Sequence, residues 1–239
     1  PSSVKIFLLA IAIFDDLGAI LIIAAFYNTS LAMIPLLMAG AGIIGLWLLN
    51  RANVTRVTPY ALLGIYLWFC FYNSGIHTTV AGVVVGMSIP MRNKRNPRHS
   101  PVNGAIHFLH PWVSFLVLPI FAFTSAGINF ANIAVEDLLN PLPLGIALGL
   151  FIGKQIGIFG TTWALIKLKL AHKPEGANWL HIYGVSILAG IGFTMSLFIG
   201  ILAFPNEEMQ EFVKIGVIGG SLFSTIWGFV ILRMAARKS

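Results

Sequence analysis

Long runs of apolar residues, separated by short polar segments, recur along the 239-residue chain. A run of about 20 apolar residues crosses a bilayer as one helix, because each residue rises ~1.5 Å. The pattern predicts an all-α fold, a polytopic transmembrane helical bundle that forms one region over residues 1–239. Its eight predicted spans cover residues 4–27, 31–50, 58–73, 75–90, 107–127, 142–168, 178–204 and 209–234.

The third and fourth spans are separated only by the sequence Asn73-Ser74-Gly75. A single helix over residues 58–90 would be ~50 Å long, which is too long for one crossing. The sequence therefore favours two spans joined by a tight turn.

Composition supports a membrane protein. The chain is 57% hydrophobic and 10% charged, with a mean hydropathy of +0.87, whereas soluble domains carry roughly 25% charged residues. The net charge of +7 is therefore not read as a sign of nucleic-acid binding. The single cysteine, Cys70, lies in an apolar span and allows no internal disulfide.

Charged residues segregate between the two sides that eight alternating crossings define. The basic side also carries the polar segment 91–103, which is typical of an orientation signal and of contact with lipid headgroups. The positive-inside rule makes this side, and both ends of the chain, cytoplasmic. The basic side receives Lys5, Arg51, Arg56, Arg92, Lys94, Arg95, Arg98, Lys167, Lys169, Lys173, Arg233, Arg237 and Lys238, with Glu175 as its one acid, and the other receives Glu136, Asp137, Glu207, Glu208, Glu211 and Lys214.

Asp15 and Asp16 lie side by side near the middle of the first span. A carboxylate at that depth costs ~2.5–3.5 kcal/mol on insertion scales, so such residues usually mark an ion or proton path. Carboxylates that hold either protons or a metal cation are the chemical basis of an exchanger. The alternative is a structural pair that neighbouring helices satisfy.

Lys154 is the one lysine or arginine deep inside a predicted span, several helical turns from either end. A buried lysine needs an acidic partner or loses its proton. We therefore expect contact with one of the two aspartates. The alternatives are a neutral lysine that itself titrates and a salt bridge with a purely structural role.

The seventh span contains Gly190-Ile191-Gly192-Phe193-Thr194 at mid-depth. Glycine and hydroxyl residues weaken a helix, and irregular backbone inside a membrane lines a cavity or packs on protein. The sequence leaves two interpretations open: a discontinuous helix that lines the ion path, or a close helix–helix contact through small residues.

Three histidines, His77, His107 and His110, lie near span ends. Imidazole titrates in the physiological range, so these side chains are candidates for a pH response. They could equally be interfacial polar residues without a specific role.

Several segments together resemble the bacterial NhaA family of Na⁺/H⁺ antiporters, in order from Lys5 to the last span. They are KIFLLAIAIFDDLGAILIIAAFY, SGIHTTVAGVVVG, HFLHPWVSFLVLPIFAFTSAGI, LGLFIGKQIGIF, KLKLAHKPEG and ILAGIGFTMSLFIGILAF. The resemblance implies part of an inverted-repeat antiporter fold, with this chain as the fifth to twelfth of twelve spans.

The resemblance also implies site roles. Asp16 matches the principal ion-binding aspartate, and Asp15 matches a second candidate for ion and proton exchange. Lys154 matches the lysine that pairs with the aspartate site. Gly190, Gly192 and Thr194 match the unwound part of a discontinuous helix, and His77, His107 and His110 match positions linked to pH response.

Two departures from the family pattern stand out. The family's fourth span, which supplies the other broken helix, has no counterpart, and the chain begins Pro1-Ser2-Ser3 without methionine. We therefore expect earlier sequence to precede it. Ile106 stands where some relatives carry a glutamate before the first histidine, which weakens an acid–histidine pH sensor.

We expect a secondary transporter that exchanges cytoplasmic Na⁺ or Li⁺ for external H⁺ by alternating access, in pH and sodium homeostasis. Its expected location is the bacterial inner membrane, its partners are these ions and membrane lipid, and it needs no cofactor. A homodimer is compatible with the sequence, which does not fix the oligomeric state. An intramembrane metalloprotease would need a HExxH-type motif, which is absent. A passive cation channel is the second alternative.

Overall fold

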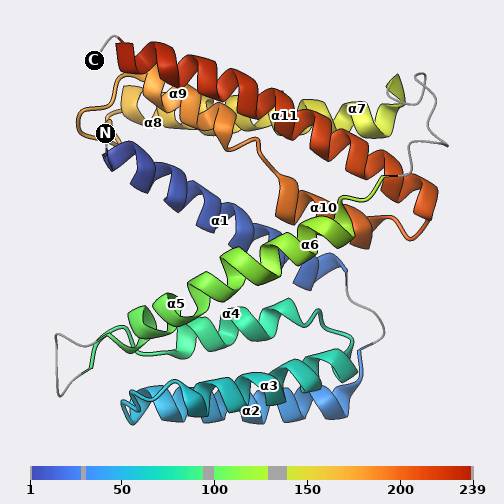
Figure 1. Cartoon of the computed structure of the whole chain (residues 1–239). Helices are drawn as coiled ribbons and strands as arrows, with labels where there is room; N and C mark the ends of the chain where they lie inside the picture. Colours follow the sequence, from blue (N-terminus) through green and yellow to red (C-terminus); the bar gives the residue numbers. More distant parts are fainter. Residues whose placement is uncertain (1, 28–30, 94–99, 129–138, 238–239) are drawn as a thin grey trace. The chain divides into compact units, whose positions relative to one another are not determined.

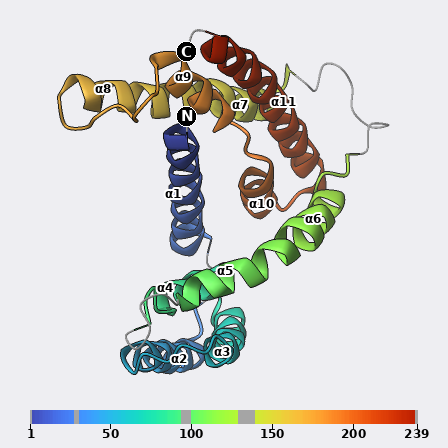
Figure 2. The same cartoon turned by 60° about the vertical axis from the view of Figure 1, so that its left-hand side comes forward.

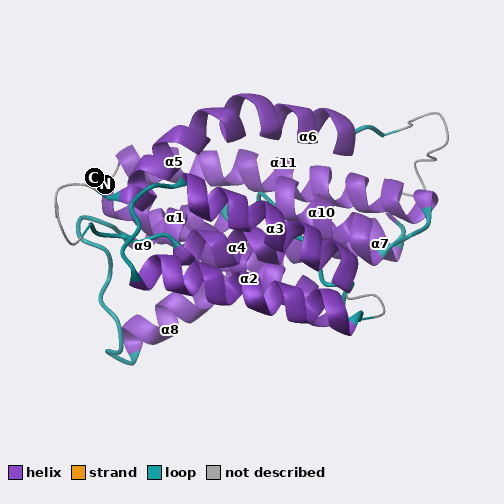
Figure 3. Cartoon of the chain, turned by 90° about the horizontal axis from the view of Figure 1, so that it is seen from below, coloured by secondary structure: helices purple, strands orange, loops and turns teal. Residues whose placement is uncertain are grey.

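The computed structural model describes residues 2–27, 31–93, 100–128 and 139–237. In these ranges all regular secondary structure is helical (Figure 3), which confirms the predicted all-α class. The chain divides into two compact units, one of residues 1–17 and 124–239 and the other of residues 18–123. Part of the basic segment 91–103, and Glu136 and Asp137, lie outside the described residues.

Helix α1 (Ser2–Phe26) begins the first unit and continues past its boundary at Leu17. The remaining helices of this unit are coloured yellow to red in Figure 1. They are α7 (Pro141–Leu148), the π-helices η4 (Gly149–Gly153) and η5 (Gln155–Gly160), α8 (Thr161–Lys167), α9 (Trp179–Leu188), α10 (Phe193–Ala203) and α11 (Glu207–Arg237).

The second unit contains the helices between these two parts of the chain. They are α2 (Met33–Arg51), α3 (Thr58–Ser74), α4 (Thr79–Ser88), α5 (Pro101–Trp112), the π-helix η1 (Val113–Val117) and most of α6 (Leu118–Ser125). Helix α3 ends because Gly75 adopts a left-handed φ of 83°, which glycine tolerates without strain. This is the tight turn that the sequence predicts between the third and fourth spans.

Helices lie within all eight predicted spans, but their lengths differ. Among the described residues, five helices are long and apolar enough to cross a membrane, and the bent pair α9–α10 counts as a sixth. Helix α3 has 17 residues and α4 has 10, so both are shorter than a typical span. The number of eight crossings stays a prediction.

Small residues determine how closely helices pack in the first unit. A methyl group on Gly216 would lie 2.7 Å from the Pro143 carbonyl oxygen, and one on Gly220 would lie 3.0 Å from the Ala147 Cα. About two turns further along α11, Gly228 meets Leu188 of α9. Glycines of this kind let helix backbones approach in a membrane, where burial of apolar surface drives little association. They bring α11 against both α7 and α9 (Figure 1).

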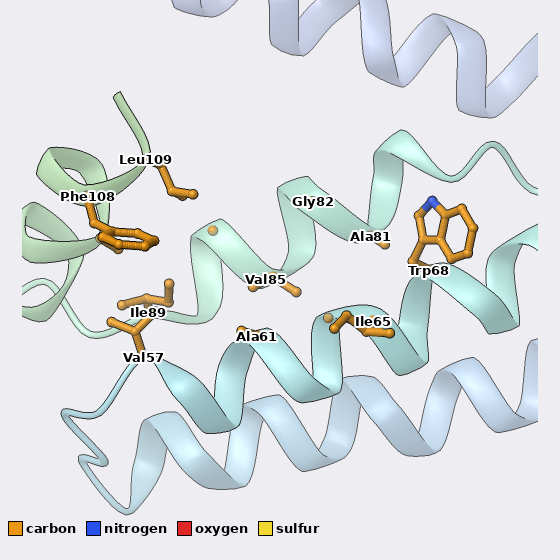
Figure 4. A pocket seen from close by; sticks show the side chains of 13 residues that line it. Val57, Ala61, Ile65, Trp68, Ala81, Gly82, Val85, Ile89, Phe108 and Leu109 are labelled. Carbon is orange, nitrogen blue, oxygen red and sulfur yellow. The ribbon is translucent and has the colours of Figure 1, made fainter. Parts of the chain in front are cut away.

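In the second unit, the buried core lies between α2, α3 and α4 and includes Leu46, Tyr60, Leu67 and Phe71. An apolar cavity of about 540 Å³ lies beside α3, α4 and α5 (Figure 4). Side chains such as Ile65, Val85 and Phe108 line it and supply no titratable or metal-binding group.

Candidate functional site

The two aspartates lie at the middle of α1, a 25-residue helix whose other residues between Ile6 and Phe26 are apolar or glycine. Adjacent helical residues point ~100° apart, so the two carboxylates face different directions. Both side chains are exposed in the structure. One helix therefore presents two carboxylates to different surroundings at mid-span.

Lys154 contacts one of these aspartates. Its Nζ donates a hydrogen bond of 2.5 Å to Asp15 Oδ1, and the Lys154 and Asp15 side chains are 23% and 53% exposed. A charge-assisted bond this short is stronger than a neutral one, although partial exposure screens it. The ion pair joins α1 to the helix of Lys154 within the first unit.

The backbone around Lys154 is unusual. Lys154 lies between η4 and η5, two stretches of π-helix within a continuous 27-residue helix from Pro141 to Lys167. Four glycines fall in these stretches, at positions 149, 153, 157 and 160. π-helical turns are rare and occur frequently at functional sites. The lysine is thus carried by a wide, glycine-rich part of its helix.

The seventh predicted span is a broken helix. Helix α9 ends at Leu188, α10 begins at Phe193, and the two axes differ by 40° (Figure 2). The Gly192 N–H donates to the Ser221 hydroxyl of α11 at 3.3 Å, so a side chain satisfies one backbone group that the break frees. Thr194 lies exposed in the first turn of α10.

The same break is also a close packing contact. Gly190 is buried, and a methyl group there would lie 2.5 Å from Ser224 Oγ and also collide with the Leu150 carbonyl oxygen. Leu150 belongs to η4, one helical turn before Lys154. The segment is therefore both a break in the helix and a close helix–helix contact. The lining of an ion path by Gly190, Gly192 and Thr194 stays a prediction.

Ser221 and Ser224 were not singled out from the sequence. Ser224 is fully buried, and its hydroxyl has no hydrogen-bond partner among the described residues. The signal in the sequence is two serines one helical turn apart, among the glycines of GGSLFS. On an apolar helix such a pair marks one polar face, which here meets the break.

The three histidines lie in the second unit. His77 lies between α3 and α4, half-buried, with Nδ1 3.0 Å from Thr79 Oγ1. His107 and His110 are exposed on α5 and share one side of the helix, three residues apart. Their link to a pH response stays a prediction.

The family model described as "Na+/H+ antiporter 1" matches residues 1–232. The chain belongs to this antiporter family. The resemblance to NhaA proteins that the sequence suggested is confirmed, and the family is one of transporters rather than an enzyme class.

Curated relatives agree across nearly all of this antiporter-family chain. The "Na(+)/H(+) antiporter NhaA 1" of Syntrophotalea carbinolica is 48% identical over 239 residues, 100% of this chain and 60% of the relative. The "Na(+)/H(+) antiporter NhaA" of Nitrobacter hamburgensis is 50% identical over 236 residues, 98% of this chain and 58% of the relative. The chain thus spans about 60% of the length of the relatives it matches.

Membership of this family and the five long apolar helices in the described ranges indicate a multi-pass protein of the inner membrane. The short ion pair of Lys154 with Asp15 thus joins two helices that are each long and apolar enough to cross a membrane.

Proposed function

We propose that the protein to which this chain belongs exchanges cytoplasmic Na⁺ or Li⁺ for external H⁺ across the bacterial inner membrane. The observation that carries the proposal is the ion pair between Lys154 and Asp15, with Asp16 beside it, in the middle of an apolar helix. An ionic group at that depth is costly and is usually retained for function.

The chemistry follows from competition for a carboxylate. Asp15 and Asp16 can each bind a proton or share a metal cation, and the Lys154 ammonium competes for Asp15. A cation that approaches the pair must displace either a proton or the ammonium from the carboxylate. Proton release and cation binding are thereby coupled at the same oxygens, and this coupling distinguishes exchange from passive flow.

Alternating access completes the cycle. When the site faces the cytoplasm, Na⁺ binds and the aspartates release their protons; when it faces outward, Na⁺ leaves and external protons bind. Hard cations take several oxygen ligands, so two carboxylates need additional oxygens. Backbone carbonyls at Gly190 and Gly192 and the Thr194 hydroxyl are the proposed contributors from the broken helix. We assign a role in pH response to His77, His107 and His110.

We also propose eight crossings with both ends of the chain cytoplasmic. The segregation of basic and acidic residues between the two sides supports this topology. Arg51 stacks on Trp47 at 5.2 Å and Lys167 on Trp163 at 5.3 Å, and these pairs suit lipid headgroups on the basic side. The protein would therefore contact membrane lipid there, and a homodimer fits this arrangement.

Everted vesicles that contain the intact protein, as its host makes it, test the function directly. Addition of Na⁺ or Li⁺ should dissipate a preformed proton gradient, and K⁺ at the same concentration should not. A passive cation channel is the competing function, and it would carry Na⁺ whether or not a pH gradient opposes the flow. Sodium flux without any coupled proton movement would contradict exchange.

A further inference from the structure

The side chain of Gln155, the residue after Lys154, is held by a hydrogen bond from a different helix. The Tyr183 hydroxyl of α9 donates to Gln155 Oε1 at 2.8 Å, and Gln155 Nε2 donates to the Phe151 carbonyl oxygen at 2.8 Å. The Gln155 amide thus joins α9 to the backbone of the Lys154 helix. No part of the proposed exchange cycle uses Tyr183 or Gln155.

The ring of Tyr183 is itself held in place. It packs edge-on against Phe159 of η5, with ring centroids 5.3 Å apart and an interplanar angle of 72°. Phe159 packs in the same manner against Trp179, at 6.0 Å and 79°. Aromatic pairs in this geometry are stabilising and directional. The hydroxyl that reaches Gln155 therefore projects from a fixed ring.

The position of Gln155 next to Lys154 gives this bond a consequence. Adjacent helical residues point ~100° apart, so Lys154 reaches Asp15 of α1 while Gln155 reaches Tyr183 of α9. Glycines on both sides of Lys154 and Gln155 make the backbone of this π-helical segment conformationally permissive. Rotation that draws Lys154 away from Asp15 must also stretch the Tyr183–Gln155 bond.

We infer that Tyr183 and Gln155 are positioning residues that hold the Lys154 ammonium against Asp15 and so set how strongly it competes with Na⁺. The inference rests on the proposed exchange function and deepens it. It requires no contact between Tyr183 and the ion. Without the Tyr183 hydroxyl, the Lys154 ammonium is held less firmly against Asp15. Na⁺ then displaces it from the Asp15 carboxylate more readily.

The decisive variant is Tyr183→Phe in the intact protein, because it removes the hydroxyl and keeps the ring that packs on Phe159. The half-saturating Na⁺ concentration for exchange in everted vesicles should fall about 3- to 10-fold, the factor that one hydrogen bond corresponds to. The maximal rate should stay within about 2-fold of the parent's. Gln155→Leu should lower the half-saturating concentration by a similar factor.

Tyr66→Phe is the matched control. Tyr66 is also half-buried, and its hydroxyl donates to the Met38 carbonyl oxygen at 3.1 Å within the second unit, whereas Asp15, Asp16 and Lys154 belong to the first. The half-saturating Na⁺ concentration of Tyr66→Phe should equal that of the parent. In a Lys154→Ala background, Tyr183→Phe should change this concentration less than about 1.5-fold, since Tyr183 acts through the lysine. An equal or higher half-saturating concentration in Tyr183→Phe overturns the inference.

A second measurement does not depend on transport. The reaction of Lys154 with a membrane-permeant amine reagent, followed by peptide mass spectrometry, should be about 3- to 10-fold faster in Tyr183→Phe and unchanged in Tyr66→Phe. Unchanged labelling contradicts the positioning role whether or not the parent exchanges ions. A parent that shows no exchange, with faster labelling in Tyr183→Phe, contradicts only the proposed function.

Discussion

Lys154 Nζ lies 2.5 Å from Asp15 Oδ1, although the two residues are 139 positions apart in the chain. Asp15 is therefore engaged by an ammonium group, while its neighbour Asp16 points in another direction along the same helix. In the proposed cycle both carboxylates bind the cation, but Asp15 must first release the lysine.

Asp16→Asn should abolish Na⁺-driven proton movement, because the amide neither binds a proton nor offers a charged oxygen to the cation. Exchange in everted vesicles should fall at least about 100-fold at normal expression, since loss of an essential group is typically that large. Glu208→Gln, at an exposed residue in the first turn of α11, is the control and should leave exchange unchanged. Sodium-driven proton movement retained by Asp16→Asn would exclude Asp16 as the ion ligand.

Lys154→Ala should lower stability more than Lys154→Arg, which can still pair with Asp15. The free energy of unfolding should fall by about 1–3 kcal/mol in Lys154→Ala. This lies between the losses typical of exposed and of buried ion pairs, because both side chains are partly exposed. Melting temperatures of the detergent-solubilised intact protein at pH 7 measure it. Lys214→Ala, which loses an exposed bond to the Gly127 carbonyl, should cost less. Equal melting temperatures for Lys154→Ala and the parent would argue against a stabilising ion pair.

Gly190→Ala should destabilise the protein by about 1–3 kcal/mol, the usual cost of overpacking. The added methyl would lie 2.5 Å from Ser224 Oγ and 3.0 Å from the Ile187 carbonyl oxygen, and backbone atoms cannot yield easily. Gly219→Ala on α11 has open space around it and should be neutral or stabilising by up to about 1 kcal/mol. A Gly190→Ala variant that melts like Gly219→Ala would show that the break is not tightly packed.

The two serines of α11 should respond in opposite ways to alanine. Ser224→Ala removes a buried hydroxyl that has no partner in the described part of the chain, so stability should stay equal or rise by about 1 kcal/mol. Ser221→Ala removes the acceptor of the Gly192 N–H and should cost about 1 kcal/mol. Thermal unfolding of both variants beside the parent checks this, and a large loss in Ser224→Ala would reveal a partner for that hydroxyl.

Sequence patterns predicted much of this arrangement, because apolar length and charge cost are local properties. The membrane cost of a carboxylate singled out Asp15 and Asp16, and the need of a buried lysine for a partner linked Lys154 to that pair. The sequence could not say which aspartate receives the lysine. That choice depends on the rotation of two helices about their axes, which is a property of their packing.

Other parts of the site had no signal of comparable strength. The π-helical turns beside Lys154 depend on backbone hydrogen bonds that the glycines permit but do not dictate. Gln155 and Tyr183 each lie in a largely apolar helix, and their pairing appears only when η5 and α9 are placed together. The glycine break was visible as a weak point, but its contact with Ser224 needed the position of α11.

The length of α11 has a consequence for the lipid that surrounds the protein. Its 31 residues would extend ~46 Å, well beyond a hydrocarbon layer of ~30 Å, but the uncharged part between Lys214 and Arg233 is about 18 residues, or ~27 Å. This segment matches the layer with its charged flanks at the two interfaces. Gly216, Gly220 and Gly228 allow α11 to pack closely against α7 and α9. A thicker bilayer would therefore tilt or displace these three helices together rather than α11 alone. Acyl-chain length should thus set the depth at which the broken helix lies in the membrane.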